Sequence, residues 1–512
     1  MGLLVMSSAG FLLTFLAFYL YVRLNDAKLM RLPPEVEATF SPHRVTPQDA
    51  REAAERLEKE PITIGEHLPP RTGRRYIVVG GAGFLGGWIV CHLLERGEDP
   101  KNIRVLDIRA PTRPDLTTGR AQSVDFLQVD ISDKAAVDAA FQAPWPGGNT
   151  SSGITVFHTV AVFRFYENHP ALLPLSDKVN VQGTQHIIDA SRAAGVSVLV
   201  FTSSGSICVR RTRLWLWPWE KQPEFFVQVI TDDDNIIPKR HEHFFSNYAA
   251  SKIKGERLVR AADNTPSGAG ILRTGCLRPG NGIFGPGGDI LCGSYLVRQT
   301  NPTWVSNTLQ NFAYVENVSL AHLCYEQRLL ETLAGSPDPD LGGQAFGITD
   351  AGPPVTYGDV YCVLNTLTDG RTVFHTLSAT AMLLLAHIFA LLHLARTRLR
   401  LAGSPLAALV PALNADLVNL QPPIFALTQV HLVWDDARAR VPPEQGGLGY
   451  APPWTTVAGL CKLVEEHERA GGKAEARSLG GGISLGFAAN RAGKGVERVI
   501  EGLALDPTAV RN

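Results

Sequence analysis

A tyrosine and a lysine one helical turn apart are the residues of this chain best suited to proton transfer. They lie in Tyr248-Ala-Ala-Ser-Lys252, near the start of an expected helix at about 246–262, so that phenol and ammonium share one face. Such pairs are often solvated surface pairs, but a close ammonium favours the phenolate and lowers its pKa. We predict that Tyr248 takes a proton from a substrate hydroxyl. Ser204, which ends an expected strand, would hydrogen-bond the same oxygen.

A glycine cluster upstream has the spacing of a dinucleotide-binding turn. The glycines stand three apart, between an expected strand at 76–79 and an expected helix at 84–96. A Cβ there would block the approach of a diphosphate to the amide groups of a helix N-terminus. A triplet of glycines can also be a plain tight turn, but the flanking strand and helix favour nucleotide binding. The predicted cofactor-binding residues of this turn are Gly80, Gly83, Phe84, Leu85 and Gly86.

Acidic residues at the ends of the next two expected strands bear on which dinucleotide binds. Asp107 can accept hydrogen bonds from ribose hydroxyls, and its charge would repel a 2′-phosphate, so NAD is favoured over NADP. Arg109 argues mildly for NADP, because an arginine can accommodate that phosphate. Asp130 is placed to meet the adenine, with a helix cap or turn as the alternative, and Ile131 is predicted to belong to the same cofactor site.

Strands that alternate with helices predict an α/β fold of the Rossmann type, a doubly wound parallel sheet with helices on both faces. Beyond Pro279 the segments become shorter and richer in glycine and proline, which is typical of a smaller C-terminal substrate lobe. We predict a domain at 74–285 that binds NAD and carries the catalytic serine, tyrosine and lysine. The substrate lobe would comprise residues 286–372 and 428–470.

Charge and cysteine content exclude some classes of function. The chain has 48 basic and 49 acidic residues, which offers no electrostatic footprint for nucleic acid. Its 7 cysteines are scattered without Cys-x-x-Cys spacing, and His241-Glu-His243 lacks the one-face spacing of zinc ligands, so we expect no metal. The cysteines are expected to be reduced in a domain that faces the cytosol.

Two apolar runs predict contact with a membrane. Residues 3–22 are long enough to cross a bilayer, and the basic residues that follow them favour a cytosolic catalytic domain, so we predict an N-terminal transmembrane anchor at 1–24 and a juxtamembrane spacer at 25–73. A second run lies within an apolar segment at 373–427. It is expected to associate with the membrane or span it, with a buried helix of a soluble core as the alternative. Residues 471–512 are expected to be a tail.

The sequence resembles the extended short-chain dehydrogenases, and within them the 3β-hydroxysteroid dehydrogenase group that includes sterol-4α-carboxylate 3-dehydrogenases. Besides the motifs above, the resemblance over about 75–470 rests on Val156-Phe-His-Thr159, Asn180-Val-Gln-Gly-Thr184, Leu277-Arg-Pro279, Gly282-Ile-Phe-Gly-Pro286 and Tyr314-Val-Glu-Asn-Val318. It implies that Asn180 supports the active site and that the segment after Arg278-Pro279 lines the pocket. Val79 departs from the threonine of many relatives. An enlarged segment between Ser204 and Tyr248 carries three tryptophans among arginines, which is typical of a membrane interface or of a packed loop.

The resemblance implies NAD-dependent oxidation of the 3β-hydroxyl of a 4-carboxylated sterol or triterpenoid, with loss of the carboxylate. It also implies membrane lipid, a membrane oxidase as a partner, and the endoplasmic reticulum as the location. One alternative is a 3β-hydroxy-Δ5-steroid dehydrogenase that also isomerises the double bond. That reaction needs a second base, which the sequence does not identify. Another is a non-catalytic NAD-binding scaffold, although such proteins commonly lose the tyrosine or lysine that this chain keeps.

Overall fold

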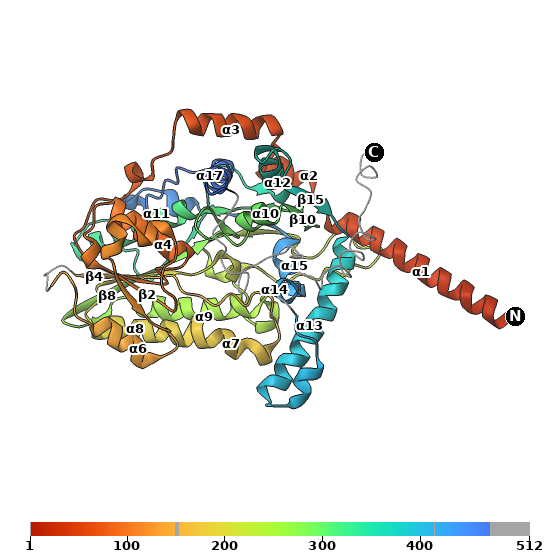
Figure 1. Cartoon of the computed structure of the whole chain (residues 1–512), viewed down its shortest axis with the longest axis horizontal. Helices are drawn as coiled ribbons and strands as arrows, with labels where there is room; N and C mark the ends of the chain where they lie inside the picture. The colour runs from red at the N-terminus through yellow and green to blue at the C-terminus, as the bar shows by residue number, and fades with distance from the viewer. Residues whose placement is uncertain (1, 149–152, 414, 472–512) are drawn as a thin grey trace.

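The computed structural model describes residues 2–148, 153–413 and 415–471, and its centre is a parallel sheet (Figure 1). Seven parallel strands run in the order β13-β8-β5-β4-β1-β2-β3, and β7 pairs with β8 in the antiparallel sense. The chain order reverses between β1 and β4, as it does in doubly wound sheets that bind nucleotides. The strands are β1 (Arg75–Val79), β2 (Ile103–Asp107), β3 (Asp125–Gln128), β4 (Ile154–His158), β5 (Val198–Thr202), β7 (Thr265–Ser267), β8 (Gly270–Pro279) and β13 (Ala345–Ile348).

Helices cover both faces of this sheet, because its central strands are apolar on both sides. In β1, Tyr76 and Val78 pack on one face, under α4 (Phe84–Glu95) and α11 (Val315–Leu333). Ile77 and Val79 pack on the other face. The helices there are α6 (Lys134–Gln142), α8 (Thr184–Ala193) and α9 (Asn247–Ala261). The predicted doubly wound α/β fold is therefore confirmed.

The smaller lobe is built around a four-stranded sheet in the order β14-β11-β16-β6. Two pairs of short strands and several helices surround it. The strands are β6 (Val227–Ile230), β9 (Ile283–Phe284), β10 (Thr300–Thr303), β11 (Leu309–Gln310), β12 (Ala313–Tyr314), β14 (Val355–Thr356), β15 (Val373–Thr376) and β16 (His431–Trp434). The helices around them are α3 (Pro47–Lys59), α10 (Cys292–Arg298), α12 (Tyr357–Leu367), α15 (Pro422–Thr428) and α17 (Thr456–Arg469). α2 (Pro34–Phe40) precedes α3, whereas α5 (Pro114–Thr117), α7 (Leu173–Asp177) and α16 (Ala437–Arg440) are short helices that contact α4, α9 and β13 of the larger lobe.

The two lobes interleave along the sequence, so the predicted boundary at residue 285 does not separate them. β6 lies inside the predicted NAD-binding domain but pairs with β16 in the small sheet. β13 lies inside the predicted substrate lobe but pairs with β8 and completes the large sheet. Both exchanges join segments far apart in the sequence, which local patterns do not reveal. The predicted tail lies, from residue 472 onward, outside the described residues.

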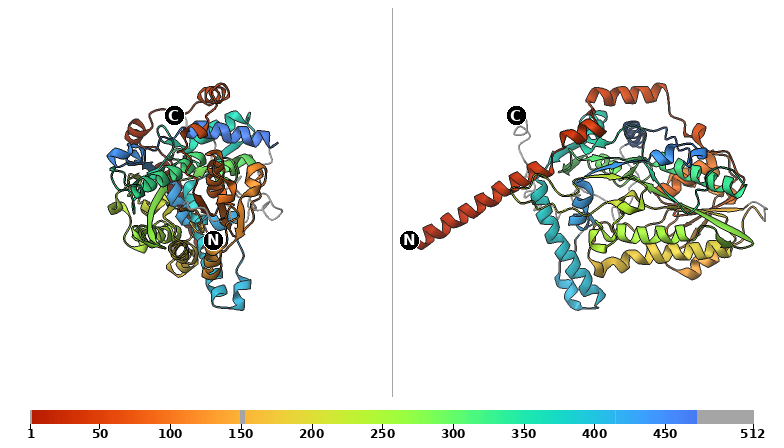
Figure 2. Two further views of the ribbon diagram at one scale, coloured as in Figure 1. Left: turned by 90° about the vertical axis from the view of Figure 1, so that its left-hand side faces the viewer. Right: turned by 180° about the vertical axis from the view of Figure 1, so that it is seen from behind.

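Two helices project from the body, α1 (Gly2–Leu29) and α13 (Ala379–Leu401), the latter followed by η9 (Pro405–Leu409) and α14 (Ala415–Asn419) (Figures 1 and 2). Among the described residues, α13 is the one helix long and apolar enough to cross a membrane by length and composition, and 28% of its apolar window is buried. This span is C-terminal. The finding therefore does not support the predicted N-terminal span.

The two projecting helices meet at their bases through polar side chains of α1. Asp26 Oδ1 accepts a hydrogen bond from the Thr380 amide of α13 at 2.8 Å. Asn25 donates through Nδ2 to Thr380 Oγ1 at 3.0 Å and to the Leu214 carbonyl at 3.1 Å. Both α1 side chains are buried. The segment that follows Ser204 is thereby held against the same joint.

Candidate active site

The glycine turn joins β1 to α4 at the carboxyl edge of the large sheet. Gly80 has φ +90°, which favours glycine, and a Cβ on Gly86 would lie 2.2 Å from the Gly80 carbonyl oxygen. Gly83 is the N-cap of α4, so the amide end of that helix opens onto the turn without a bulky side chain. A backbone this tightly folded fits the approach of a dinucleotide diphosphate.

Asp107 reaches the glycine turn, as the sequence predicts. It is the last residue of β2, and its Oδ2 accepts a hydrogen bond from the Ala82 amide at 3.2 Å. Burial raises its pKa above the usual value, although bonds from backbone amides oppose this effect. The carboxylate therefore stands beside the turn, where a ribose of a bound dinucleotide would lie.

The other predicted adenine contacts have different surroundings. Asp130 is exposed, and its Oδ1 accepts a hydrogen bond from the Ser132 amide at 2.9 Å, so it makes the turn contact that was the alternative interpretation. Ile131 is 4% exposed and packs in the hydrophobic core. A Cβ on Gly183 would lie 2.7 Å from the Ile131 side chain. The side chain of Ile131 therefore fills the core, and its part in the cofactor site stays a prediction.

Tyr248 and Ser204 are brought together at the same edge of the sheet. Ser246 caps α9 by accepting a hydrogen bond from the Ala249 amide at 3.2 Å, which fixes Tyr248 in the first turn. The Tyr248 ring stacks on Phe163, with ring centroids 5.4 Å apart. Burial raises the pKa of Tyr248 to about 12, and a hydrogen bond with Ser204 opposes that rise.

Lys252 lies one turn further along α9 and is 1% exposed. Its Nζ donates to the Thr202 carbonyl at 2.7 Å and lies 4.0 Å from the centre of the Phe201 ring. Burial lowers its pKa to about 7, and the nearby acidic groups, the Cys276 thiol and the Glu256 carboxylate, only partly oppose this effect. The expected lowering of the tyrosine pKa by lysine is thus not found in the chain alone. Burial dominates both groups, and the Lys252 ammonium is directed to backbone.

Asn180 supports this arrangement, as the resemblance implies. It lies in a π-helical turn at Lys178–Gly183 and is 1% exposed. Its Oδ1 accepts from the Val162 amide at 2.8 Å, and its Nδ2 donates to Ser251 Oγ at 2.9 Å. Ser251 Oγ in turn donates to the Tyr248 carbonyl at 2.9 Å. The asparagine therefore ties the loop after β4 to the catalytic helix.

Two features of this site were not predicted from the sequence. One is Phe163, whose ring covers Tyr248. The other is a buried ion pair in which Arg278 donates to Glu256 at 2.5 and 3.1 Å, while Ser203 donates to the same carboxylate at 2.6 Å. Glu256 stands four residues after Lys252, so the stripe of Tyr248, Lys252 and Glu256 along α9 could have revealed it. Phe163 has no comparable signal.

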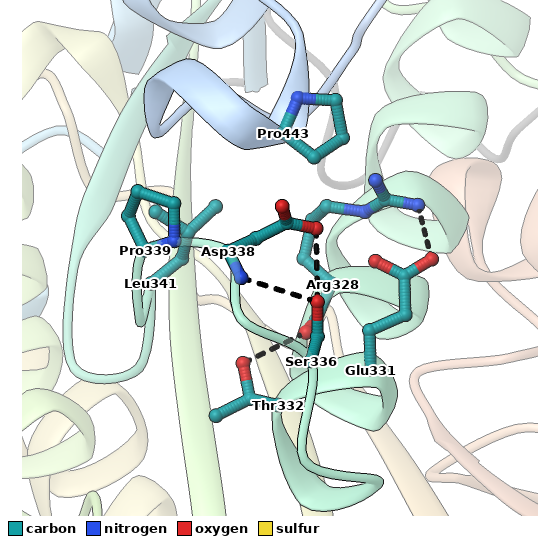
Figure 3. Close-up of a pocket in the computed structure, with 8 residues that line it drawn as sticks. All are labelled: Arg328, Glu331, Thr332, Ser336, Asp338, Pro339, Leu341 and Pro443. Carbon is teal, nitrogen blue, oxygen red and sulfur yellow. Dashed lines mark hydrogen bonds and ion pairs between the residues drawn. The ribbon is translucent and has the colours of Figure 1, made fainter.

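A small pocket elsewhere has no part in this site. It is formed where α11 ends and the chain turns back toward β13, at the amino edge of the large sheet (Figure 3). An ion pair between Arg328 and Glu331 at 2.7 Å lines it, together with a hydrogen bond from Ser336 to Asp338 at 2.9 Å. The predicted catalytic residues lie at the opposite edge, because parallel strands share one carboxyl edge.

Comparison with known proteins identifies the family. The model of the 3-beta hydroxysteroid dehydrogenase/isomerase family matches residues 77–372, which include the glycine turn, Ser204, Tyr248 and Lys252. The chain belongs to this family. It is also similar to the 3beta-hydroxysteroid-dehydrogenase/decarboxylase isoform 2 of Arabidopsis thaliana, at 28% identity over 434 residues, which covers 80% of this chain and 66% of the relative.

A second relative is the decarboxylating sterol-4-alpha-carboxylate 3-dehydrogenase of Candida albicans, at 29% identity over 289 residues, 54% of this chain and 70% of that protein. The chain spans 66% and 58% of the lengths of the two Arabidopsis relatives that it matches. Among solved structures, an epimerase from Methanothermobacter thermautotrophicus aligns with a TM-score of 0.51 and 16% identity, covering 81% of this chain and 98% of that one. This last likeness supports the fold alone.

Proposed function

We propose that this member of the 3β-hydroxysteroid dehydrogenase family oxidises the 3β-hydroxyl of a 4-carboxylated sterol or triterpenoid to the ketone, with NAD as the cofactor. One observation carries the proposal: Ser204, Tyr248 and Lys252 gather at the carboxyl edge of the sheet that also bears the glycine turn. The names of the plant and yeast relatives support the substrate class. Asp107 beside the turn supports NAD over NADP.

The side chains of this chain have distinct tasks in that reaction. Tyr248, in its ionised phenolate form, takes the proton of the 3-hydroxyl and becomes the neutral phenol, and Ser204 holds the substrate oxygen by a hydrogen bond. Lys252, with a pKa near 7, can hold or release a proton at Nζ one helical turn away. Bound NAD supplies the acceptor for the hydride that leaves carbon 3. The alcohol at carbon 3 thus loses two electrons and two hydrogens, one as a proton to the protein and one as the hydride.

Loss of the carboxylate follows from the chemistry of the product. A ketone at carbon 3 and a carboxylate at carbon 4 form a β-keto acid. When the bond between carbon 4 and the carboxyl carbon breaks, carbon dioxide leaves and the electron pair moves to the ketone oxygen as an enolate, which is then protonated at carbon 4. A hydrogen-bond donor at that oxygen stabilises the enolate. Ser204, which hydrogen-bonds with Tyr248, is the donor that we propose for this task.

Two other functions are alternative candidates for this site. The family name includes an isomerase, so oxidation of a 3β-hydroxy-Δ5-steroid followed by movement of the double bond is the second candidate. Its product is a conjugated enone, formed without carbon dioxide. A non-catalytic scaffold is the third. Retention of Ser204, Tyr248 and Lys252 at one edge of the sheet speaks against a scaffold.

We also propose that the chain works at a membrane, with its catalytic domain on the cytosolic side of the endoplasmic reticulum. The length and composition of α13 support this, as do the exposed Trp217 and Trp219, which are 58% and 75% exposed. The proposal of a further anchor at residues 1–24 is supported by the exposed apolar side chains of α1, such as Phe11, which is 77% exposed. Membrane lipid and an oxidase that makes the carboxylate are the proposed partners. Flotation of the full chain with phospholipid vesicles tests the lipid contact.

The reaction is tested by incubating the full chain in detergent with NAD and a 4-carboxysterol labelled at the carboxyl carbon. We expect NADH and labelled carbon dioxide in equal amounts. A Tyr248→Phe variant should bind NAD like the wild type but lose about 10²-fold to 10⁴-fold in rate. A conjugated enone from a Δ5 substrate, without release from the carboxysterol, would favour the isomerase. Full activity of the Tyr248→Phe variant would overturn the mechanism.

A further inference from the structure

The loop that follows β4 joins the catalytic tyrosine to the apolar helix α13. This β4 loop, residues 159–169, carries Phe163 on the ring of Tyr248 and is tied to Asn180 at Val162. Its far end approaches α13, which lies more than two hundred residues later in the sequence. The loop is therefore the structural element between the reacting phenol and a helix that projects from the body (Figure 1).

Glu167 is the buried acidic residue of the β4 loop that contacts α13, alongside Tyr166 and His169. Its side chain is buried, and its Oε1 accepts a hydrogen bond from His393 Nε2 of α13 at 2.8 Å. Arg164 of the same loop donates to both carboxylate oxygens, through Nε at 2.8 Å to Oε2 and through a second bond to Oε1. Although burial alone would raise it, these partners hold the pKa of Glu167 below its usual value. Separating α13 from the loop would leave a buried carboxylate with one partner fewer, which is unfavourable.

The same residue also contacts the catalytic helix through its backbone. The Glu167 carbonyl accepts a hydrogen bond from the Asn247 amide at 2.6 Å, and Asn247 is the first residue of α9, immediately before Tyr248. A second path runs in parallel: Arg398 of α13 donates to His169 Nε2 at 3.0 Å, and the His169 carbonyl accepts from Asn247 Nδ2 at 3.0 Å. Both paths end on the residue beside the phenol.

We propose that Glu167 is a positioning residue, through which α13 holds the β4 loop so that Phe163 covers Tyr248 and the first turn of α9 keeps its place. The inference rests on the proposed dehydrogenase reaction for its effect on turnover. Because the outer side of α13 exposes Leu391 at 68% and Ile388 at 45%, lipid is the partner that would seat this helix. Seating α13 in lipid and ordering the β4 loop are then one event.

The test compares two histidines of α13 that make one side-chain hydrogen bond each to different parts of the body. His393→Ala removes the bond to Glu167. His387→Ala is the matched control, because His387 Nε2 accepts from Trp215 Nε1 at 3.1 Å, and Trp215 lies outside the β4 loop. For both full-length variants and the wild type, in phospholipid vesicles, we would measure hydrogen exchange of the amides at 162–169 and 247, together with kcat and KM for the alcohol.

In the His393→Ala variant we expect exchange of these amides to rise about tenfold or more, and kcat to fall about tenfold at unchanged NAD affinity, because a small misplacement of a catalytic group is costly. A His393→Gln variant, which can still donate to Glu167, should recover most of both effects. The His387→Ala variant should match the wild type in the β4 loop. Equal effects in both alanine variants, or an unchanged β4 loop in His393→Ala, would overturn the proposal. If the wild type shows no dehydrogenase activity, the exchange measurement still decides whether the loop is held by α13.

Discussion

Replacement of Lys252 by methionine tests whether burial lowers the pKa of this lysine, through the pH dependence of the free energy of unfolding. The Lys252 ammonium has a pKa of about 7 in the folded chain, because it is buried, against a usual value of 10.5. Between these two values the unfolded chain binds one proton more than the folded chain. The lysine therefore makes folding less favourable at neutral pH, and the free energy of unfolding rises by about 1.4 kcal/mol for each unit that the pH increases. Methionine fills a similar volume and does not titrate.

The difference between the two chains can be stated in advance. From about pH 7.5 to about pH 9.5, the free energy of unfolding of the wild type should rise by roughly 2–3 kcal/mol relative to Lys252→Met. The Thr202 carbonyl loses its partner in the variant, but this cost does not depend on pH and cancels in the comparison. Equilibrium urea unfolding at several pH values supplies the measurement. Tyr248→Phe is the control, because its phenol titrates above this range. Parallel curves for wild type and Lys252→Met would refute the depressed pKa.

Three further outcomes are expected. Gly86→Ala should weaken NAD binding and lower the free energy of unfolding by about 1–3 kcal/mol, because the new Cβ would lie 2.2 Å from a backbone oxygen of the turn. In the control Gly293→Ala the new Cβ would lie 3.4 Å from its nearest neighbour, so NAD titration and urea unfolding should both match the wild type. Glu256→Gln and Arg278→Met should each lower the free energy of unfolding in urea by about 3–5 kcal/mol, and the double variant should lose clearly less than the sum of the two losses. Additive losses would mean that the two side chains do not interact. The rate of alcohol oxidation should increase as the pH rises from about 7 to about 9. Burial raises the pKa of the Tyr248 phenol to about 12, and the phenol acts as a base only when it is ionised. A rate that peaks below pH 7 would exclude Tyr248 as that base.

The large sheet and the catalytic edge could be predicted because their signals are local. The glycine turn, the strand that precedes it and the i, i+4 pair on α9 each lie within a few residues of sequence. Parallel topology then places the strand ends together without any knowledge of side-chain contacts. Asp107 beside Ala82 follows from the same rule.

The remaining features depend on contacts that sequence periodicity does not encode. β13 joins the sheet from within the other lobe, and His393 meets Glu167 across 226 positions. The opposite pKa shifts of Tyr248 and Lys252 depend on burial, which is a property of the packed core. The packing of the Ile131 side chain in the core is likewise a contact that its place in the sequence does not reveal.

The joint between α1 and α13 bears on how a shortened form of the protein should be made. Asp26 accepts from the Thr380 amide in the first turn of α13, and Asn25 bonds both that helix and the Leu214 carbonyl. Trimming the apolar start of the chain to improve handling in solution should therefore stop before Asn25. A cut five residues later would leave the buried Thr380 amide in the first turn of α13 without its partner, and the loss of stability would appear far from the cut in sequence.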